Sequence, residues 1–151
     1  MANSNHNIGN AGEFAVLSQL AHRGYIAAKT DDGQTLIDVI ATDPDTLRSI
    51  NIQVKTTKHK SADYWMMSVK NEQVFESLWY VLVALGEPDA RPVFHIFHST
   101  EVGPWLKKDH ASWLSKPKQN GEDRKDSNMR KFRPSLDQLA TAKENWEALF
   151  S

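Results

Sequence analysis

The sequence contains no cysteine among its 151 residues. Disulfide bonds and thiolate metal sites are therefore excluded, and we expect a reducing, cytoplasmic compartment. No apolar run approaches the roughly 20 residues that a membrane span needs. The N-terminal residues have neither a basic start nor an apolar segment, so we expect no signal peptide and no membrane partner.

A strong excess of one charge is also missing, since 18 Lys and Arg face 19 Asp and Glu for a formal net charge of −1. This balance excludes a uniformly basic nucleic-acid coat, but it is compatible with an enzyme whose acidic site offsets a basic groove. The hydrophobic fraction of 40% and the charged fraction of 25% are those of an ordinary globular protein. We therefore predict a single domain over residues 1–151.

The apolar pattern changes period several times along the chain. Alternating or β-branched runs predict six strands, at 25–28, 36–42, 50–57, 65–69, 80–85 and 92–98. Helical spacing predicts helices at 10–23, at 70–75, from 101 onward and within 136–150. We expect residues 1–8 to be flexible and residues 115–134 to form a long polar loop. The order predicts an α/β or α+β domain with one sheet flanked by helices.

The most informative polar residues lie on the predicted hairpin. Asp38 stands in its first strand, and Gln53 and Lys55 stand in its second. Side chains two apart in a strand share a face, so Gln53 and Lys55 point the same way while Val54 points into the core. Pairing of the two strands across the turn at 43–45 brings Asp38 close to both.

This grouping suits phosphodiester hydrolysis, which needs charge neutralisation at the phosphate and an activated water. Mg²⁺ supplies both when oxygen ligands hold it. Asp38 is the candidate direct ligand, with the Gln53 amide oxygen and the Val54 backbone carbonyl beside it. Lys55 is a candidate for orienting or deprotonating the water, and Glu13 of the first helix for completing the outer shell. An exposed strand face with an incidental ion pair is the alternative reading.

Glu13, Asp38, Gln53 and Lys55, in this order on a helix and a hairpin, resemble the PD-(D/E)xK (restriction-endonuclease-like) nuclease superfamily. The match takes its Gln-x-Lys form, as in Holliday-junction resolvases and Mrr-like restriction enzymes. Ile37 stands where many members have proline, and Gln53 replaces an acidic residue. The resemblance implies an α/β fold with a central mixed β-sheet flanked by α-helices, Mg²⁺ or Mn²⁺ as cofactor, and DNA as partner. It implies that the four residues are catalytic, with the metal at Glu13, Asp38, Gln53 and the Val54 carbonyl. It also allows a homodimer that cuts two strands.

Residues directly after the motif are the candidates for phosphate contacts, because DNA in the site must pass over that strand end. A second set comes from residues 116–133, where seven basic residues face three acidic ones, although a solvated loop explains that surplus almost as well. The candidate nucleic-acid-binding residues are Thr56, Thr57, Lys58, Lys60, Arg130 and Lys131.

Two functions remain open on the residues alone. The first is a metal-dependent endonuclease, a hydrolase of DNA phosphodiester bonds. The second is a catalytically eroded nucleic-acid- or protein-binding module on the same fold, acting in a defence or repair complex. Gln53 separates the two, because an amide in place of a carboxylate leaves fewer negative charges around the metal.

Overall fold

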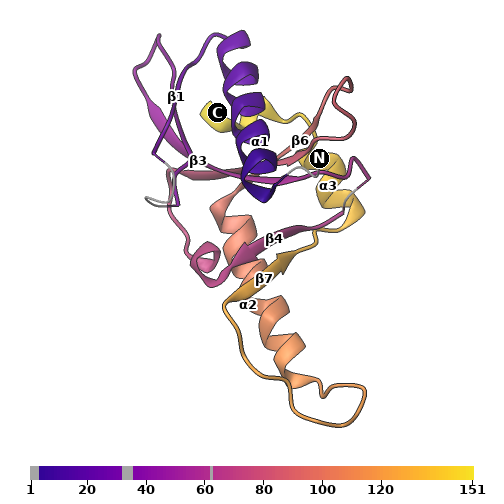
Figure 1. The fold of residues 1–151 in the computed structure, drawn as a ribbon. Helices are drawn as coiled ribbons and strands as arrows, with labels where there is room; N and C mark the ends of the chain where they lie inside the picture. The colour runs from indigo at the N-terminus through magenta and orange to yellow at the C-terminus, as the bar shows by residue number, and fades with distance from the viewer. Residues whose placement is uncertain (1–3, 32–35, 62) are drawn as a thin grey trace.

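The computed structural model of the protein describes residues 4–31, 36–61 and 63–151. A five-stranded sheet in the order β1-β2-β3-β5-β6 forms its centre (Figure 1). The strands β3 and β5 are parallel and the other neighbours are antiparallel. Their bounds are β1 Ile26–Lys29, β2 Val39–Thr42, β3 Ser49–Thr57, β5 Leu78–Ala84 and β6 Val93–His98.

Helices and a small second sheet cover the two faces. The helix α1 (Asn5–His22) and the 3-10 helix η2 (Trp146–Phe150) lie on one face. The opposite face carries α2 (Ser99–Ser115) and the antiparallel pair of β4 (Trp65–Ser68) and β7 (Met129–Phe132), seen beneath the main sheet in Figure 1. A short 3-10 helix η1 (Val69–Glu72) follows β4, and α3 (Leu136–Ala142) follows β7. The predicted α/β fold, a mixed sheet flanked by helices, is confirmed.

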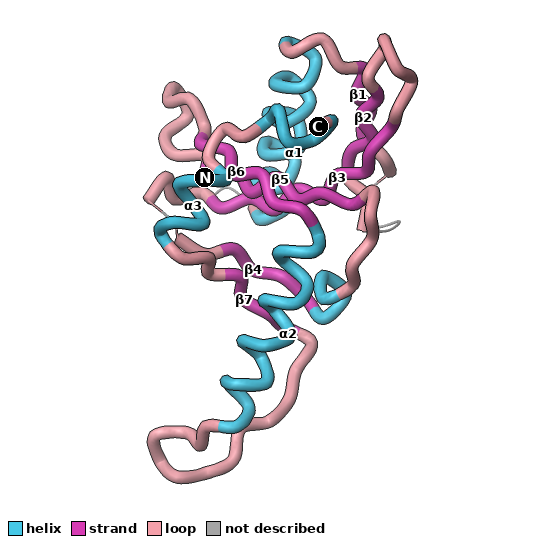
Figure 2. The backbone as a smooth tube through the Cα atoms, turned by 180° about the vertical axis from the view of Figure 1, so that it is seen from behind, coloured by secondary structure: helices cyan, strands magenta, loops and turns pink. Residues whose placement is uncertain are grey.

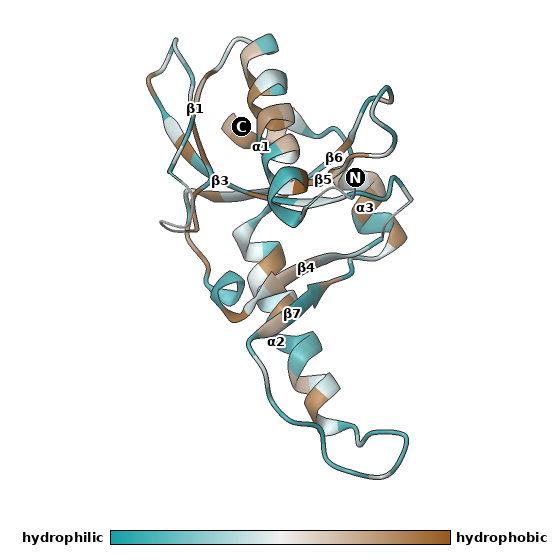
Figure 3. Cartoon of the chain, in the orientation of Figure 1, coloured by the Kyte–Doolittle hydropathy of each residue, from teal (hydrophilic) through white to brown (hydrophobic). Residues whose placement is uncertain are grey.

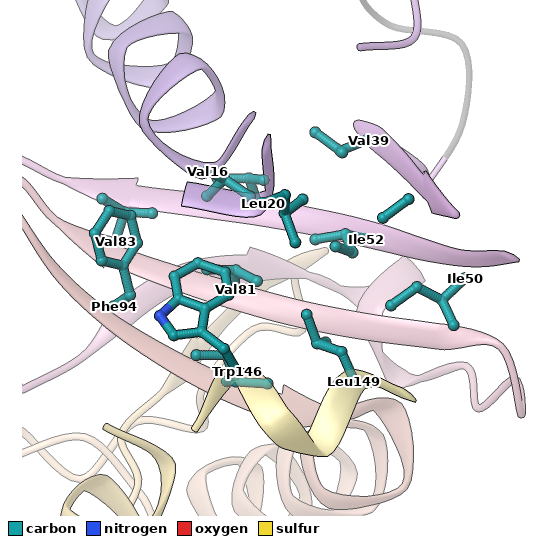
Figure 4. Packing of buried hydrophobic residues seen from close by; sticks show 13 residues of the cluster. Val16, Leu20, Val39, Ile50, Ile52, Val81, Val83, Phe94, Trp146 and Leu149 are labelled. Atoms are coloured by element: carbon teal, nitrogen blue, oxygen red, sulfur yellow. The ribbon is translucent and has the colours of Figure 1, made fainter. Parts of the chain in front are cut away.

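The alternation of side chains along the strands separates two cores. Ile50, Ile52 and Val54 of β3 face α1, where the helix contributes Val16 and Leu20 (Figure 4). The opposite face holds a second cluster, which includes Tyr80, Leu82, Trp65 and Phe132. Because both faces of β5 are covered, its sequence is an almost continuous apolar run rather than an alternating one.

The first helix begins earlier than its apolar spacing indicated. The Ser4 side chain accepts a hydrogen bond from the Asn7 backbone N–H at 3.1 Å and caps the helix, so Asn5 to Ile8 form its first turn. The prediction that residues 1–8 are flexible is wrong for this turn, and residues 1–3 lie outside the described part. The helix ends before Gly24, whose φ of +90° is the left-handed conformation that glycine favours.

The predicted polar loop at 115–134 is correct only in part. Residues 129–132 form β7, which pairs with β4 in the register Trp65↔Phe132 to Ser68↔Met129. The remaining segment extends beyond the exposed end of α2 as a polar loop (Figures 2 and 3). The C-terminal helix is also divided, because Lys143 bridges to His95 and the Glu144 N–H donates to the Phe94 carbonyl. Within the described ranges, no helix is both long and apolar enough to cross a membrane.

Candidate active site

The backbone of Asp38 is held from both sides, just before β2 begins. Its N–H donates to the Ile52 carbonyl of β3 at 2.8 Å, and its own carbonyl accepts from the Thr30 N–H at 2.9 Å. In a regular strand the N–H and C=O of one residue point to the same neighbouring strand, so these two bonds show that the regular ladder of β2 ends at Asp38. The two bonds hold the Asp38 backbone between β1 and β3.

The Asp38 carboxylate replaces the next backbone partner of β3. Its Oδ2 accepts the Val54 backbone N–H at 2.8 Å and the Gln53 side-chain Nε2 at 2.5 Å. Gln53 is only 7% exposed and stands beside Tyr80 of β5. The structure therefore brings Asp38 and Gln53 together, as the hairpin pairing predicted. Within this contact Gln53 acts as a hydrogen-bond donor.

Two ionisable groups of this site are shifted toward their neutral forms. Burial raises the pKa of Asp38, and it outweighs the opposing hydrogen bonds from Val54 and Gln53 and the positive charges of Lys55 and Lys29. Burial likewise lowers the pKa of Lys55, against the opposing charge of Asp38. A carboxyl with a raised pKa beside an amine with a lowered pKa, both half-buried, is typical of functional sites rather than of surface ion pairs.

Glu13 reaches the site through a second residue. Its Oε2 lies 3.2 Å from the Nζ of Lys29, whose strand partner Val39 packs toward α1. Glu13 therefore lies on the α1 side of the sheet, whereas Asp38 and Gln53 point to the other side. The charge of Lys29 lowers the pKa of Asp38, which places Lys29 near both carboxylates. Sequence reasoning missed Lys29, and its position at the end of the strand that pairs with β2 is the signal that could have found it.

The face that presents Asp38 is partly uncovered. Ile26, Ala28 and Ile40 share this face and are exposed, at 61% for Ile26 and 41% for Ile40. Tyr80 and Leu82, farther along the same face, are fully buried under the second layer. Asp38 thus lies at the border between the covered and the open part of the sheet and is half-buried.

The oxygen donors here fit a hard divalent cation. They are Oδ1 of Asp38, the amide oxygen of Gln53 and the carbonyl of Val54, which faces the same edge as its N–H. Burial raises the pKa of Asp38, and a bound cation would oppose this by stabilising the ionised carboxylate. No group of three or more His, Asp or Glu side chains in the described chain is arranged to hold a metal. Asp38 therefore carries the negative charge of this donor set.

The predicted nucleic-acid-binding residues of β3 and its following loop differ in their exposure. Lys58 and Lys60 are exposed and line a groove of about 870 Å³, between residues 58–61 and the turn at 85–92. Thr57 is half-buried at the end of β3. Thr56 instead faces α1, where it packs against Gly12 and its Oγ1 is buried.

The assignment of Arg130 to nucleic-acid binding requires correction. Arg130 is 8% exposed, and its Nε donates to Glu72 at 2.7 Å. Its Nη1 donates to the Ser127 and Met129 carbonyls. All of these partners lie within the protein, because strand alternation points Arg130 inward. The neighbouring Lys131 points outward and is exposed.

Comparison with solved structures supports the fold. The chain is similar to a bacterial homing endonuclease, I-Ssp6803I, with a TM-score of 0.59 at 10% sequence identity. The likeness covers 98% of this chain and 92% of the homing endonuclease. No protein-family model and no curated protein matches the sequence. At this identity the likeness establishes a shared, nuclease-like α/β fold.

Proposed function

We propose that this protein is a divalent-metal-dependent endonuclease that hydrolyses DNA phosphodiester bonds at Asp38, Gln53 and Lys55. The observation that carries the proposal is the half-buried Asp38 carboxylate, held by Gln53 and Val54, next to the half-buried Lys55. Its place on a fold shared with a homing endonuclease supports the proposal. The PD-(D/E)xK assignment, in its Gln-x-Lys form, is part of it.

Each residue has a separable role in this proposal. Asp38, Gln53 and the Val54 carbonyl would hold Mg²⁺ or Mn²⁺, which when bound neutralises phosphate charge and acidifies a water. Lys55 positions that water or takes its proton, a role favoured by a pKa that burial lowers. Glu13 acts indirectly, because its contact with Lys29 sets the charge next to Asp38.

Cleavage of plasmid and linear duplex DNA in Mg²⁺ or Mn²⁺ tests the proposal. Lys55→Ala should lower the cleavage rate by a factor of about 100 or more, the usual contribution of a positioned acid–base group. Asp38→Asn removes the carboxylate proposed to hold the metal and should lower the rate at least as far. Asp45→Asn, an exposed carboxylate in the turn of the same hairpin, should leave the rate unchanged. Equal rates in all four proteins would show that the cleavage comes from a contaminant.

Metal binding provides a second readout. Titration calorimetry with Mn²⁺ should detect a site in the wild type that Asp38→Asn abolishes and Asp45→Asn retains. Absence of any such site would refute the catalytic role of Asp38.

A non-catalytic binding module is the second candidate. Its support is that Gln53 donates to Asp38 and that Glu13 contacts Lys29, so that one carboxylate remains for the metal. Duplex binding without cleavage in either metal would favour this function over the first. The homodimer stays a prediction, which light scattering of the full chain measures directly.

A further inference from the structure

The outer face of the β4–β7 ribbon carries an unusual combination of side chains. Trp65 and Phe132 pair with each other and point into the protein. The next pair, Met66 with Lys131, points outward and is exposed. The same alternation places Tyr64 and Arg133 on the outer face, at the end of the ribbon. This face has no covering layer within the described chain.

A single aromatic ring holds two positive charges on this face. The Nζ of Lys131 lies 4.6 Å from the ring centroid of Tyr64, and the Cζ of Arg133 lies 5.0 Å from it. The ring attracts each cation, but the two cations repel each other. Asp63 compensates only Arg133, at 3.8 Å, through an exposed and therefore weak ion pair. The described part of the chain offers Lys131 no carboxylate within ion-pair distance.

We infer that Tyr64, Lys131 and Arg133 form a binding site for a backbone phosphate of duplex DNA, outside the active site. A phosphate bound by both cations removes their repulsion and gains charge-assisted hydrogen bonds from each. The supporting element also fits this partner, because the DNA major groove admits a two-stranded β-ribbon. The inference rests on the proposed function for the identity of the nucleic acid.

Of the other basic residues of this region, Arg130, Arg124 and Lys118 each have a partner within the protein. Arg130 is bonded to Glu72, as described above. In the loop beyond α2, the Arg124 guanidinium lies over Trp113 at 4.8 Å, and Lys118 lies 4.0 Å from Glu122. Lys131 and Arg133 therefore contribute exposed positive charge at the ribbon, whereas Arg130 does not.

Binding of a short duplex of generic sequence, measured by fluorescence anisotropy in the Asp38→Asn background, tests the site without cleavage. The double variant Lys131→Ala/Arg133→Ala should bind roughly ten-fold more weakly. Its slope of log K against log salt should fall by about 1, since the site binds one phosphate and each phosphate contributes about 0.9. The control Lys107→Ala/Lys108→Ala removes the same charge from exposed positions in the middle of α2 and should change binding less than about three-fold.

Single substitutions distinguish a specific site at Tyr64, Lys131 and Arg133 from non-specific attraction between positive charges and DNA. Tyr64→Ala should weaken binding, because the two cations lose their common support, whereas Tyr64→Phe should bind as the parent does. Asp63→Asn should bind more tightly, since it removes the competing carboxylate. Thermal unfolding of each variant shows whether it is folded.

Three results would overturn the inference: an equal loss in the two double variants, an unchanged salt slope, or no duplex binding by the Asp38→Asn parent. Cleavage by the wild type is measured separately. An active nuclease whose ribbon variants bind normally therefore refutes the phosphate site alone. An inactive protein whose ribbon variants lose binding refutes the nuclease alone.

Discussion

Replacing Gly12 with alanine tests how closely α1 docks on the strand that carries the candidate active site. A Cβ at Gly12 would lie 1.9 Å from the Oγ1 of Thr56 and 2.8 Å from its Cβ and Cγ2. Rotation of Thr56 cannot relieve this contact, because its Cβ is fixed by the β3 backbone. The helix must therefore move away from the sheet or the strand must bend.

The expected magnitude follows from two opposing terms. Overpacking costs about 1–3 kcal/mol, and the short distances place this substitution at the upper end of that range. Alanine gains about 1 kcal/mol over glycine inside a helix. The net loss of unfolding free energy is about 2 kcal/mol, or roughly 4–8 °C in the midpoint of thermal unfolding for a domain of this size.

Gly9 provides the matched control, since it lies in the same helix and a Cβ there meets nothing within 4 Å. Gly9→Ala should raise the unfolding midpoint by about 2–4 °C through helix propensity alone. Thermal unfolding followed by circular dichroism measures both variants. Equal shifts for Gly9→Ala and Gly12→Ala would refute the close docking of α1 on β3. In the Gly12→Ala background, Thr56→Ala should restore part of the loss, because it removes Oγ1 and Cγ2 but keeps Cβ.

Two further predictions concern buried polar groups. Burial lowers the pKa of His95 below its ordinary 6.5, so the native state holds it neutral and stability should fall as the pH drops from 6.5 through the lowered value. His95→Gln should reduce this pH dependence of the unfolding free energy, measured by denaturant titrations at neutral pH and at about pH 5. The control His59→Gln, at an exposed position, should leave the pH dependence unchanged. Equal pH dependence in the wild type and both variants would contradict the argument. Glu72→Ala leaves the Arg130 guanidinium buried without its carboxylate, and we expect a loss of about 3 kcal/mol in chemical unfolding. The exposed ion pair of Lys118 and Glu122 provides the comparison, because Glu122→Ala should lower the unfolding free energy by less than about 1 kcal/mol. A similar loss for Glu72→Ala and Glu122→Ala would show that burial of the ion pair does not matter.

The candidate site combines a hydrogen-bonded backbone with two ionisable groups whose charged forms are disfavoured by burial. The Asp38 carboxylate completes the hydrogen bonding of β3 through the Val54 N–H, so the strand itself determines its position. Burial then disfavours the charged forms of Asp38 and Lys55 at the same location. A protein under selection for stability alone would favour a neutral pair there. This loss of stability is consistent with the proposed function, in which a bound cation and a phosphate would stabilise the charged forms of the two side chains.

The β2–β3 hairpin illustrates which contacts can be predicted from the sequence. Asp38 directly precedes β2 and Gln53 lies in β3, and a short turn joins the two strands, so the predicted pairing sufficed to predict their contact, which the structure contains. The same reasoning failed for Arg130, because a strand at 129–132 exists only through its pairing with β4. Without that partner, a short polar segment has no local signal for strand structure.

The sequence by itself determined the elements whose periodicity is local: the first helix, the β2–β3 hairpin, and the buried strand β5 with its continuous apolar run. The tertiary structure decided which charges compensate one another. It paired Glu13 with Lys29, buried Arg130 on Glu72, and gathered Lys131 and Arg133 on Tyr64. The physical reason is that alternation follows from backbone geometry over a few residues. Electrostatic partners, in contrast, depend on distances and burial that arise only when distant segments pack together.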